Sequence, residues 1–404
     1  MRLKRLLCAL AALLLLPTAL GEATREGEIA VPELNDICQY EIPDTEAMAF
    51  LKRMGVGWNL GNTFDAVRDT AAPDEMSIER YWCGETTTEA MIGAVRDAGF
   101  STVRIPVSWH NHVDADFTLS QPWLDRVQQV ADWALARGMT VILNTHHDVY
   151  PEYYYPTEEH RETSERYIAR VWAQLAERFA EYDDHLIFES MNEPRMKDSR
   201  WEWWLNENEP ECQEAVACVN RLNQLFVDTV RATGGMNADR YLMVPGYDAS
   251  ASSALSERFT LPEDSADHRL IVSVHAYTPY SFALEDPGTD RFTLKSFSQA
   301  REINDFMSGL YDKYICEGIP VVIGEFGARE KNGNLQSRVD FAAFYVASAS
   351  ARNIPCCWWD NNVFTGDGER FGLLRRRDCA WPYPEIVGAI MRYAGYDSIA
   401  ARPE

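Results

Sequence analysis

The sequence contains eight short apolar runs, and most of them are followed by a longer segment with a helical pattern of apolar residues. The runs are continuously apolar rather than alternating, which is typical of parallel strands covered on both faces. Eight such units in one chain favour an α/β fold, a single (β/α)8 TIM barrel, over a doubly wound sheet. The predicted strands are Val56–Leu60, Thr102–Val107, Thr140–Asn144, Leu186–Ser190, Tyr241–Val244, Leu270–Val274, Val321–Gly324 and Pro355–Trp359.

Amphipathic segments lie between these runs. Over residues 122–137, apolar residues recur at steps of three and four, which indicates one buried stripe. The threonines at 86–88 and Glu89 provide N-cap chemistry for the first of the segments. We predict helices over Thr87–Ala98, Pro122–Arg137, Ser164–Tyr182, Gln213–Thr233, Phe297–Glu317, Gln336–Ala351 and Pro384–Tyr393, with a weakly helical stretch at Ser252–Leu261.

The N-terminus predicts a secretory signal peptide. Residues 1–5 are basic, residues 6–16 are apolar but too few to span a bilayer, and small residues follow up to Gly21. We expect cleavage near Gly21 and a secreted, extracellular protein that makes no membrane contact afterwards; the alternative is an uncleaved membrane anchor. The predicted organisation is a signal peptide over 1–21, a poorly ordered lead-in with the first helix over 22–45, and one catalytic domain over 46–404.

The charge excludes some classes of partner. The sequence contains 38 Lys and Arg residues and 62 Asp and Glu residues, which gives a net charge of −24. Nucleic acids and anionic membranes both require clustered cations, so we expect neither as a partner. An acidic surface is compatible with a soluble monomer that acts on a neutral substrate.

Eight cysteines remain once Cys8 leaves with the signal peptide. Export permits disulfides, but eight cysteines in a chain of this length do not form a dense framework. Cys212 could pair with Cys218, and Cys379 with Cys356 or Cys357. The pairing stays open at this point.

Large polar and aromatic residues gather where the predicted strands end. In a (β/α)8 barrel the C-terminal ends of the strands meet at the active site. The residues at these ends are Trp58 and Asn59, Arg104 and Trp109, His146 and His147, Asn192 and Glu193, His275 and Tyr277, Glu325, and Trp359.

Two of these side chains are carboxylates on opposed strands, Glu193 on the fourth and Glu325 on the seventh. Such a pair can flank a scissile glycosidic bond, where one acid protonates the leaving oxygen and the other carboxylate attacks or activates water. Glu189 is a rival donor, but we expect it to point into the barrel interior and to be held by a basic partner.

Several stretches closely resemble glycoside hydrolase family 5, and within it the endoglucanase-type subfamily 4. The resemblance implies a (β/α)8 barrel and a retaining mechanism, with Glu193 as the acid/base and Glu325 as the nucleophile. It also implies a supporting shell of Arg104, His146, Asn192, His275, Tyr277 and Trp359. The stretches are GVGWNLGNTFDA (55–66), AGFSTVRIPVSWHNHV (98–113), VILNTHHD (141–148), LIFESMNEPR (186–195), HAYTPY (275–280), VVIGEFGA (321–328) and CWWDNN (357–362).

These roles carry physical expectations. Arg104 and the Tyr277 hydroxyl should keep Glu325 ionised, whereas Glu193 should begin protonated and less well compensated. Asn192 should contact the sugar 2-hydroxyl, and retention requires carboxyl groups about 5–5.5 Å apart.

Sugar rings stack on aromatic side chains, so we consider Trp58, Trp109, Trp203, Trp359 and Tyr280 as platforms. Loop packing is an equal alternative for Trp203. Strand alternation should turn Trp359 toward the site and Trp358 toward the helices. His146 and His147 invite a metal site, but hydrogen bonding to sugar hydroxyls is simpler, and we expect no metal and no cofactor.

Four functions remain open. The first is a secreted endo-β-1,4-glucanase (a cellulase) that acts on cellulose-like glucans, xyloglucan or mixed-linkage β-glucan. The second is a β-mannanase with the same mechanism. The third is a non-catalytic carbohydrate-binding protein, and a metal-dependent amidohydrolase is the weakest alternative.

Overall fold

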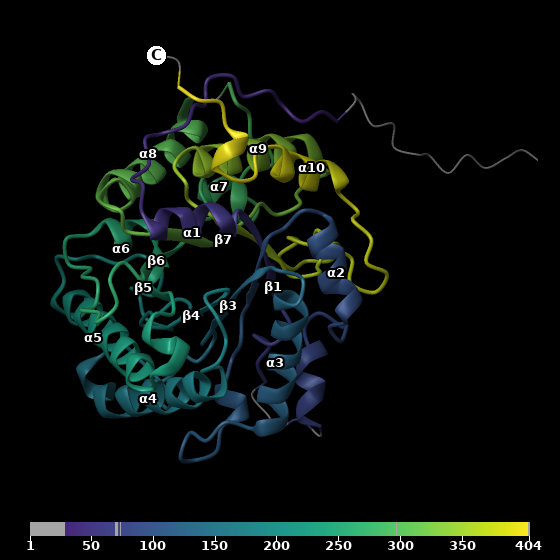
Figure 1. Ribbon diagram of the computed structural model, residues 1–404. Helices are drawn as coiled ribbons and strands as arrows, with labels where there is room; N and C mark the ends of the chain where they lie inside the picture. Colours follow the sequence, from purple (N-terminus) through teal and green to yellow (C-terminus); the bar gives the residue numbers. More distant parts are fainter. Residues whose placement is uncertain (1–28, 69–71, 73, 296, 403–404) are drawn as a thin grey trace, which may run out of the picture.

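A computed structural model describes residues 29–68, 72, 74–295 and 297–402 of the chain. The predicted signal peptide therefore lies outside the described residues. Eight parallel strands form a closed barrel in the order of the sequence, which confirms the predicted (β/α)8 fold (Figure 1). The strands are β1 (Val56–Leu60), β2 (Thr102–Ile105), β3 (Thr140–Asn144), β4 (Leu186–Glu189), β5 (Leu242–Ser250), β6 (Leu270–His275), β7 (Val321–Phe326) and β8 (Cys356–Asp360).

The helices lie outside the barrel, and seven agree with the predicted segments to within four residues at each end. Each turns an apolar stripe to the strands; in α3, for example, Leu124, Val127 and Ala131 are buried. The helices are α1 (Glu46–Met54), α2 (Glu89–Asp97), α3 (Gln121–Leu135), α4 (Arg161–Arg178), α5 (Pro210–Ala232), α6 (Ala251–Leu255), α7 (Tyr280–Ala283), α8 (Phe297–Lys313), α9 (Leu335–Ala351) and α10 (Pro384–Arg392).

Strand β5 is longer than predicted. The prediction ended at Val244 because Pro245 and Gly246 are typical of a loop. In the structure the strand continues to Ser250, after a register shift against β6. Asp248 and Ala249 adopt φ values of 49° and 53°, which turn the end of the strand toward the β4 side of the barrel mouth.

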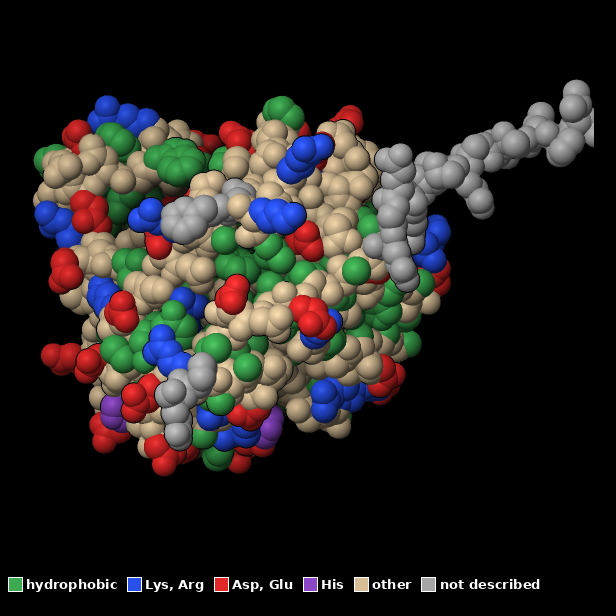
Figure 2. All heavy atoms as spheres, turned by 90° about the horizontal axis from the view of Figure 1, so that it is seen from above, with side chains coloured by type: hydrophobic (Ala, Val, Ile, Leu, Met, Phe, Trp, Pro, Cys, Tyr) green, Lys and Arg blue, Asp and Glu red, His purple; other side chains and the backbone are tan. Residues whose placement is uncertain are grey.

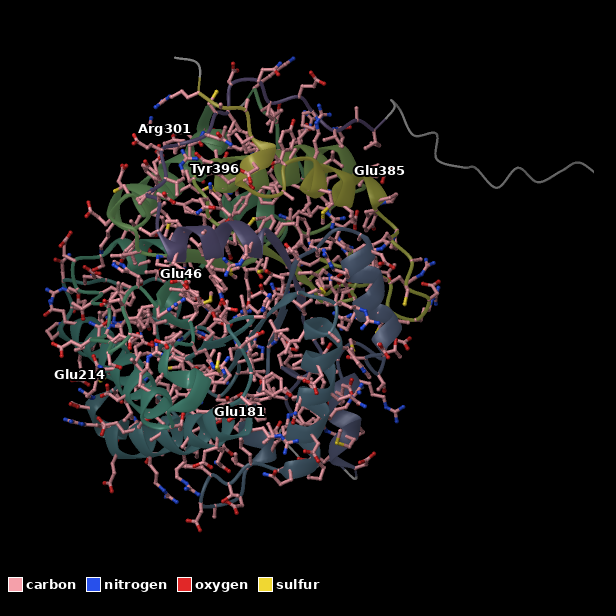
Figure 3. All side chains as sticks on the ribbon, in the orientation of Figure 1. Glu46, Glu181, Glu214, Arg301, Glu385 and Tyr396 are labelled. Carbon is pink, nitrogen blue, oxygen red and sulfur yellow. The ribbon has the colours of Figure 1, made fainter. Side chains whose placement is uncertain are left out.

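Helix α1 closes the N-terminal end of the barrel. Phe50 stacks on Tyr241 just before β5, with ring centroids 3.9 Å apart. Glu46, labelled in Figure 3, forms an ion pair of 2.8 Å with Arg269 just before β6. We expected the first helix within residues 22–45, but it begins at Glu46. The Thr45 side chain accepts a hydrogen bond from the Met48 N–H and so caps the helix at this point. Residues 29–45 lie against the C-terminal segment, where the Gln39 N–H donates to Ala400.

The eight described cysteines are free, so neither candidate disulfide forms. Cys212 and Cys218 both lie on α5. Six residues along one helix correspond to about 9 Å, which exceeds the Cα separation that a disulfide can span. Among the described helices, none is long and apolar enough to cross a membrane. Acidic and basic side chains are interspersed over the face drawn in Figure 2.

Arg240 lies just before β5 and links it by hydrogen bonds to the segment at the start of β4. Its side chain is buried, and burial lowers the pKa of its guanidinium to about 10. Every nitrogen of the guanidinium donates at least one hydrogen bond. The acceptors are the carbonyl oxygens of Phe179, Tyr182, Asp183 and Leu186 and the side-chain oxygen of Asn237, at 2.7–3.0 Å.

We predict that Arg240→Met lowers the free energy of unfolding by about 3–5 kcal/mol, because four carbonyl groups and the Asn237 side chain lose a donor that is itself buried. Urea unfolding followed by circular dichroism would measure the change. Arg392→Met is the control, since Arg392 pairs with Glu33 on the surface and should contribute less than about 1 kcal/mol. A loss for Arg240→Met as small as that of the control would contradict the prediction.

Candidate active site

Arg104 lies at the centre of the site, where β2 ends inside the barrel. It is fully buried. Its Nε donates to Glu189 and its Nη1 to Glu325, both at 2.7 Å. Nη1 also donates to Asn59 at 3.0 Å and Nη2 to Asn192 at 2.8 Å. Burial alone would lower the pKa of Arg104, but the two carboxylates outweigh it and hold that pKa above its ordinary value.

Glu189 points into the barrel, as predicted. It is fully buried, and besides Arg104 it accepts hydrogen bonds from Asn144 at 3.0 Å and Ser273 at 2.6 Å. All of these contacts are to protein groups. Glu189 is therefore a structural counter-charge for Arg104.

Glu325 is held on both oxygens. Oε1 accepts from Arg104, and Oε2 accepts from the Tyr277 hydroxyl at 2.9 Å. Burial, with the charge of Glu325, keeps the pKa of Tyr277 well above its ordinary value, so the phenol stays protonated and donates. A carboxylate with two fixed donors and 6% of its side chain exposed is suited to act as an oriented nucleophile.

Glu193 lies across the barrel mouth from Glu325. Its Oε1 is 2.9 Å from Nδ1 of His275, and its Oε2 is 3.7 Å from Nη1 of Arg195. Burial raises the pKa of Glu193, but the His275 hydrogen bond and the charge of Arg195 outweigh burial, so that the pKa lies below its ordinary value. Glu193 is thus better compensated than we expected from the sequence, because Arg195 adds its charge to the hydrogen bond from His275.

His275 joins the two carboxylates. Its Nε2 lies 3.3 Å from Nη2 of Arg104, which can only donate, so the lone pair belongs on Nε2 and the proton on Nδ1, facing Glu193. Burial lowers the pKa of His275, while the charges of Glu325 and Glu193 raise it, and the result lies above the ordinary value. Gly324 makes room for this ring, since a Cβ there would lie 3.1 Å from Nε2.

His146, His147 and Trp359 line the other side of the site. Trp359 lies parallel to His146, with ring centroids 5.8 Å apart and planes inclined by 2°. Burial holds the pKa of His146 well below its ordinary value and lowers that of His147 to about 4. Both imidazoles are therefore neutral and can each donate and accept one hydrogen bond.

Trp58 and Trp109 are not platforms, so this part of the prediction is wrong. Both side chains are fully buried. Trp58 donates to Asp360 at 2.8 Å and Trp109 to the Asn144 carbonyl at 2.9 Å. Strand alternation explains Trp58: Asn59 points into the barrel, so its neighbour must point out toward the helices. Asn59 itself supports Arg104 rather than meeting solvent.

The exposed aromatic residues lie on loops at the barrel mouth. Sequence reasoning considered Trp203 and Tyr280, which are 48% and 46% exposed. It missed Trp204, which lies edge-on to Tyr280 at 5.9 Å, and Trp82, which is 5.7 Å from the His147 ring. Trp204 belongs to the aromatic run 201–204, and the density of tryptophans in that run could have predicted an exposed aromatic surface there.

Two groups of side chains in the cleft could offer ligand atoms to a metal, each within 4.8 Å of one another: Glu193 with His275 and Glu325, and Asp65 with His146 and His147. The positive charge of Arg104 faces the first group directly. Arg104 and Arg195 also lower the pKa of the two histidines of the second group. The same charges would oppose a bound cation, so the donor set suits hydrogen bonding better than metal ligation.

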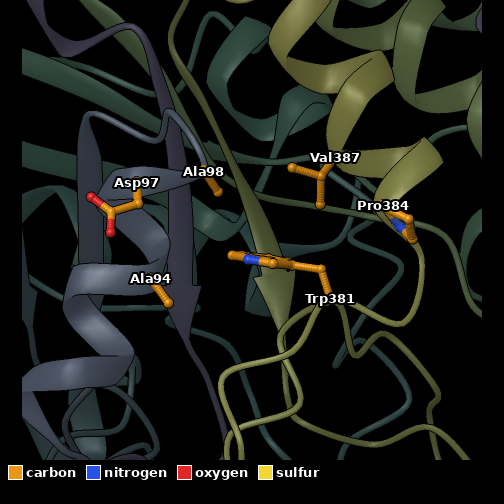
Figure 4. A pocket seen from close by; sticks show the side chains of 6 residues that line it. All are labelled: Ala94, Asp97, Ala98, Trp381, Pro384 and Val387. Carbon is orange, nitrogen blue, oxygen red and sulfur yellow. The ribbon is translucent and has the colours of Figure 1, made fainter.

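A surface hollow lies far from these residues (Figure 4). Ala94, Asp97 and Ala98 of α2 face Trp381 and the start of α10 across it. Helix α2 ends where β2 begins, so this hollow belongs to the N-terminal end of the barrel. None of its lining residues belongs to the site.

Comparison with known proteins gives one consistent result. The profile of the cellulase family, glycosyl hydrolase family 5, matches residues 64–365. The chain is 41% identical to endoglucanase 1 of Ruminococcus albus over 358 residues, which covers 88% of this chain and 84% of that protein. A family 5 lichenase from Caldicellulosiruptor sp. F32 has a TM-score of 0.89 at 55% identity, over 91% of this chain and all of the other. A broad-specificity GH5-4 endoglucanase from Ruminococcus champanellensis with bound cellotriose has a TM-score of 0.80 at 41% identity, over 87% of this chain and all of the other.

Gly61 is the residue that makes room for Trp359. A Cβ at position 61 would lie 2.8 Å from the indole and 3.0 Å from the Asp360 carbonyl oxygen. We predict that Gly61→Ala displaces the ring and weakens binding of a cello-oligosaccharide about 10- to 100-fold, since a shift of about 1 Å can cost that much.

Isothermal titration calorimetry with a catalytically silent Glu325→Gln background would measure the affinity. Gly388→Ala is the matched control, because a Cβ at Gly388 on α10 meets no atom within 4 Å. An unchanged affinity for Gly61→Ala would show that Trp359 is not a platform.

Proposed function

This chain belongs to glycoside hydrolase family 5, the cellulase family, and on that premise we propose that it cleaves internal β-1,4-glucosidic bonds of β-glucans by a retaining double displacement. The enzyme is thus an endo-β-1,4-glucanase. In this proposal Glu193 is the acid/base and Glu325 is the nucleophile.

One observation supports this assignment most directly. An oxygen of Glu193 and an oxygen of Glu325 lie within 4.8 Å of each other across the barrel mouth. Retaining enzymes hold their two carboxyl groups about 5–5.5 Å apart, whereas inverting enzymes leave about 6.5–9.5 Å for a water molecule. The spacing leaves room for direct attack on the anomeric carbon.

In the first step, Glu325 attacks the anomeric carbon while the bond from that carbon to the leaving oxygen breaks. Arg104 and Tyr277 orient the attacking carboxylate. Glu193 gives its proton to the leaving oxygen, which departs as the hydroxyl of the shortened glucan. His275 and Arg195 lower the pKa of Glu193, so the bound substrate must raise that pKa by excluding water from the carboxyl group before Glu193 can carry the proton.

In the second step, water attacks the anomeric carbon of the glycosyl–Glu325 ester. The bond from that carbon to Glu325 breaks and releases the carboxylate, while Glu193 accepts the proton of the water. His275 and Arg195 lower the pKa of Glu193, which keeps its carboxylate in the deprotonated form that this step requires. The side-chain oxygen of Asn192 accepts a hydrogen bond from Arg104, so its NH2 group can donate to the sugar 2-hydroxyl. His146 and His147, both neutral, would bind further hydroxyls beside the Trp359 ring.

The substrate we propose is a soluble β-glucan chain: a cellulose-like glucan, xyloglucan or mixed-linkage glucan. The exposed aromatic residues on both sides of the carboxylates suit a chain that passes through the cleft. The named relatives are endoglucanases and a lichenase, which supports glucan over mannan. We also propose that the protein is secreted and acts as a monomer, based on its N-terminal sequence and its charge.

We predict reducing-sugar release from at least one of carboxymethyl-cellulose, xyloglucan and mixed-linkage glucan. Glu325→Gln should lower that rate at least about 10³-fold because it removes the nucleophile. The matched control is Glu46→Gln, which changes an exposed carboxylate at the opposite end of the barrel.

The other outcomes identify the other functions. Faster release from mannan than from every glucan would indicate a β-mannanase. Binding without release would indicate a carbohydrate-binding protein. Loss of activity in a chelator, restored by a divalent metal, would indicate a metal-dependent hydrolase.

The two carboxylates can be told apart by azide and an activated substrate, 2,4-dinitrophenyl β-cellobioside. We predict that Glu193→Ala still forms the glycosyl enzyme, so azide gives the β-cellobiosyl azide. Glu325→Ala forms none, so azide attacks directly and gives the α-azide. Proton NMR of the anomeric signal distinguishes the products, and the reverse assignment of azides would exchange the two roles.

A further inference from the structure

Arg195 is a buried arginine next to the acid/base, and it has no step of its own in the mechanism above. It follows Glu193 by two residues on the β4 loop (residues 190–209), and only 7% of it is exposed. Its Nη1 donates to the Glu193 carbonyl at 2.9 Å and lies 3.7 Å from the Glu193 carboxylate. The guanidinium thus contacts both the backbone and the side chain of the acid/base.

The far side of the guanidinium is held by the same loop. Nε donates to Glu202 at 3.1 Å, and the guanidinium carbon lies 4.1 Å from the centre of the Trp203 ring. Glu202 in turn accepts from the Asp198 N–H at 2.9 Å, which closes the loop on itself. Arg195 therefore has one fixed position, determined by an ion pair on one side and an aromatic face on another.

We propose that Arg195 is a positioning residue for Glu193, and that its guanidinium, fixed by Glu202 and Trp203, sets the pH above which the enzyme loses its general acid. The proposal rests on the proposed function, because it requires Glu193 to be the acid/base. The proposal assigns a role to a residue that does not belong to the group of side chains around Arg104.

Several other ionisable groups also act on Glu193, and any of them could set its protonation. An arginine stays charged at every working pH, while the histidines, carboxyls and phenols of this set titrate. The positive charge of Arg195 thus stays constant, while the charges of the other groups in this set change with pH. The set comprises His147 and Tyr154 after β3, Asp248 at the end of β5, His275 and Tyr277 at and after β6, Glu325 on β7 and Glu369 after β8, together with Arg195.

The direction of the effect follows from the charge. A fixed positive charge stabilises the carboxylate form of Glu193, so it lowers the pH at which the proton is lost. The first step needs that proton, and its loss limits kcat/KM on the alkaline side. Removing the charge should therefore move the alkaline limb of the kcat/KM profile to higher pH.

The test compares three variants on a glucan substrate. Arg195→Met removes the charge and keeps most of the apolar stem, and we expect its alkaline limb to move up by about 1–2 pH units. Arg195→Lys keeps the charge and should stay close to the wild-type limb. Glu202→Gln removes the ion pair but keeps a side-chain oxygen that can accept from Arg195, and it keeps the Arg195 charge, so it should lower the rate without an upward shift.

A purely structural role makes a different prediction: Arg195→Met and Glu202→Gln would then both lower the rate, and neither would move the limb. That result, or an equal shift for Arg195→Lys and Arg195→Met, would overturn the proposal. If Arg195→Met does not fold, Arg195→Gln also lacks the charge and replaces it in the same comparison.

The substrate 2,4-dinitrophenyl β-cellobioside separates this proposal from the proposed function. Its leaving group needs no proton, so its alkaline limb should be the same in wild type and Arg195→Met. Glu193→Gln should cleave it while failing on the glucan. A Glu193→Gln variant that cleaves both equally well would reject Glu193 as the acid, whereas an unmoved limb in Arg195→Met rejects only the role of Arg195.

Discussion

The site depends on one buried guanidinium shared between two buried carboxylates. Arg104 on β2 reaches Glu189 on β4 and Glu325 on β7, and so connects strands from three parts of the barrel. Either carboxylate without it would be a buried charge with no counter-charge, which costs several kcal/mol. The side-chain oxygens of Asn59 and Asn192 also accept hydrogen bonds from the Arg104 guanidinium. Arg104 therefore contacts the proposed nucleophile Glu325, the Asn192 amide beside Glu193 and the Asn59 amide of β1 at the same time.

Much of this architecture could be predicted from the sequence, because strands covered on both faces are continuously apolar and their ends are marked by polar residues. The positions of Glu193 and Glu325 at the barrel mouth and of Glu189 inside the barrel were predictable for the same reason. The errors have physical causes. Trp58 was misplaced because its neighbour Asn59 takes the inward position. The ionisation of Glu193 and the contacts of Arg195 depend on loop geometry, which no spacing in the sequence encodes.

The cleft is asymmetric about the two carboxylates. On one side, His146, His147 and Trp359 form a buried wall with neutral hydrogen-bonding groups. On the other side, Trp203, Trp204 and Tyr280 stand exposed on the loops after β4 and β6. Glu193, the proposed acid/base, lies between these two groups of side chains: it contacts His275 and Arg195, and Arg195 packs on Trp203.

The free thiols described above have a consequence for where the enzyme can work. No disulfide joins the eight described cysteines, so packing and hydrogen bonds hold the barrel together. Burial also raises the pKa of Cys356 and of Cys357, the latter to about 12, which suppresses the reactive thiolate. Strong reductants have no cross-link to break in the described fold, so the barrel should keep its stability under conditions that reduce disulfides.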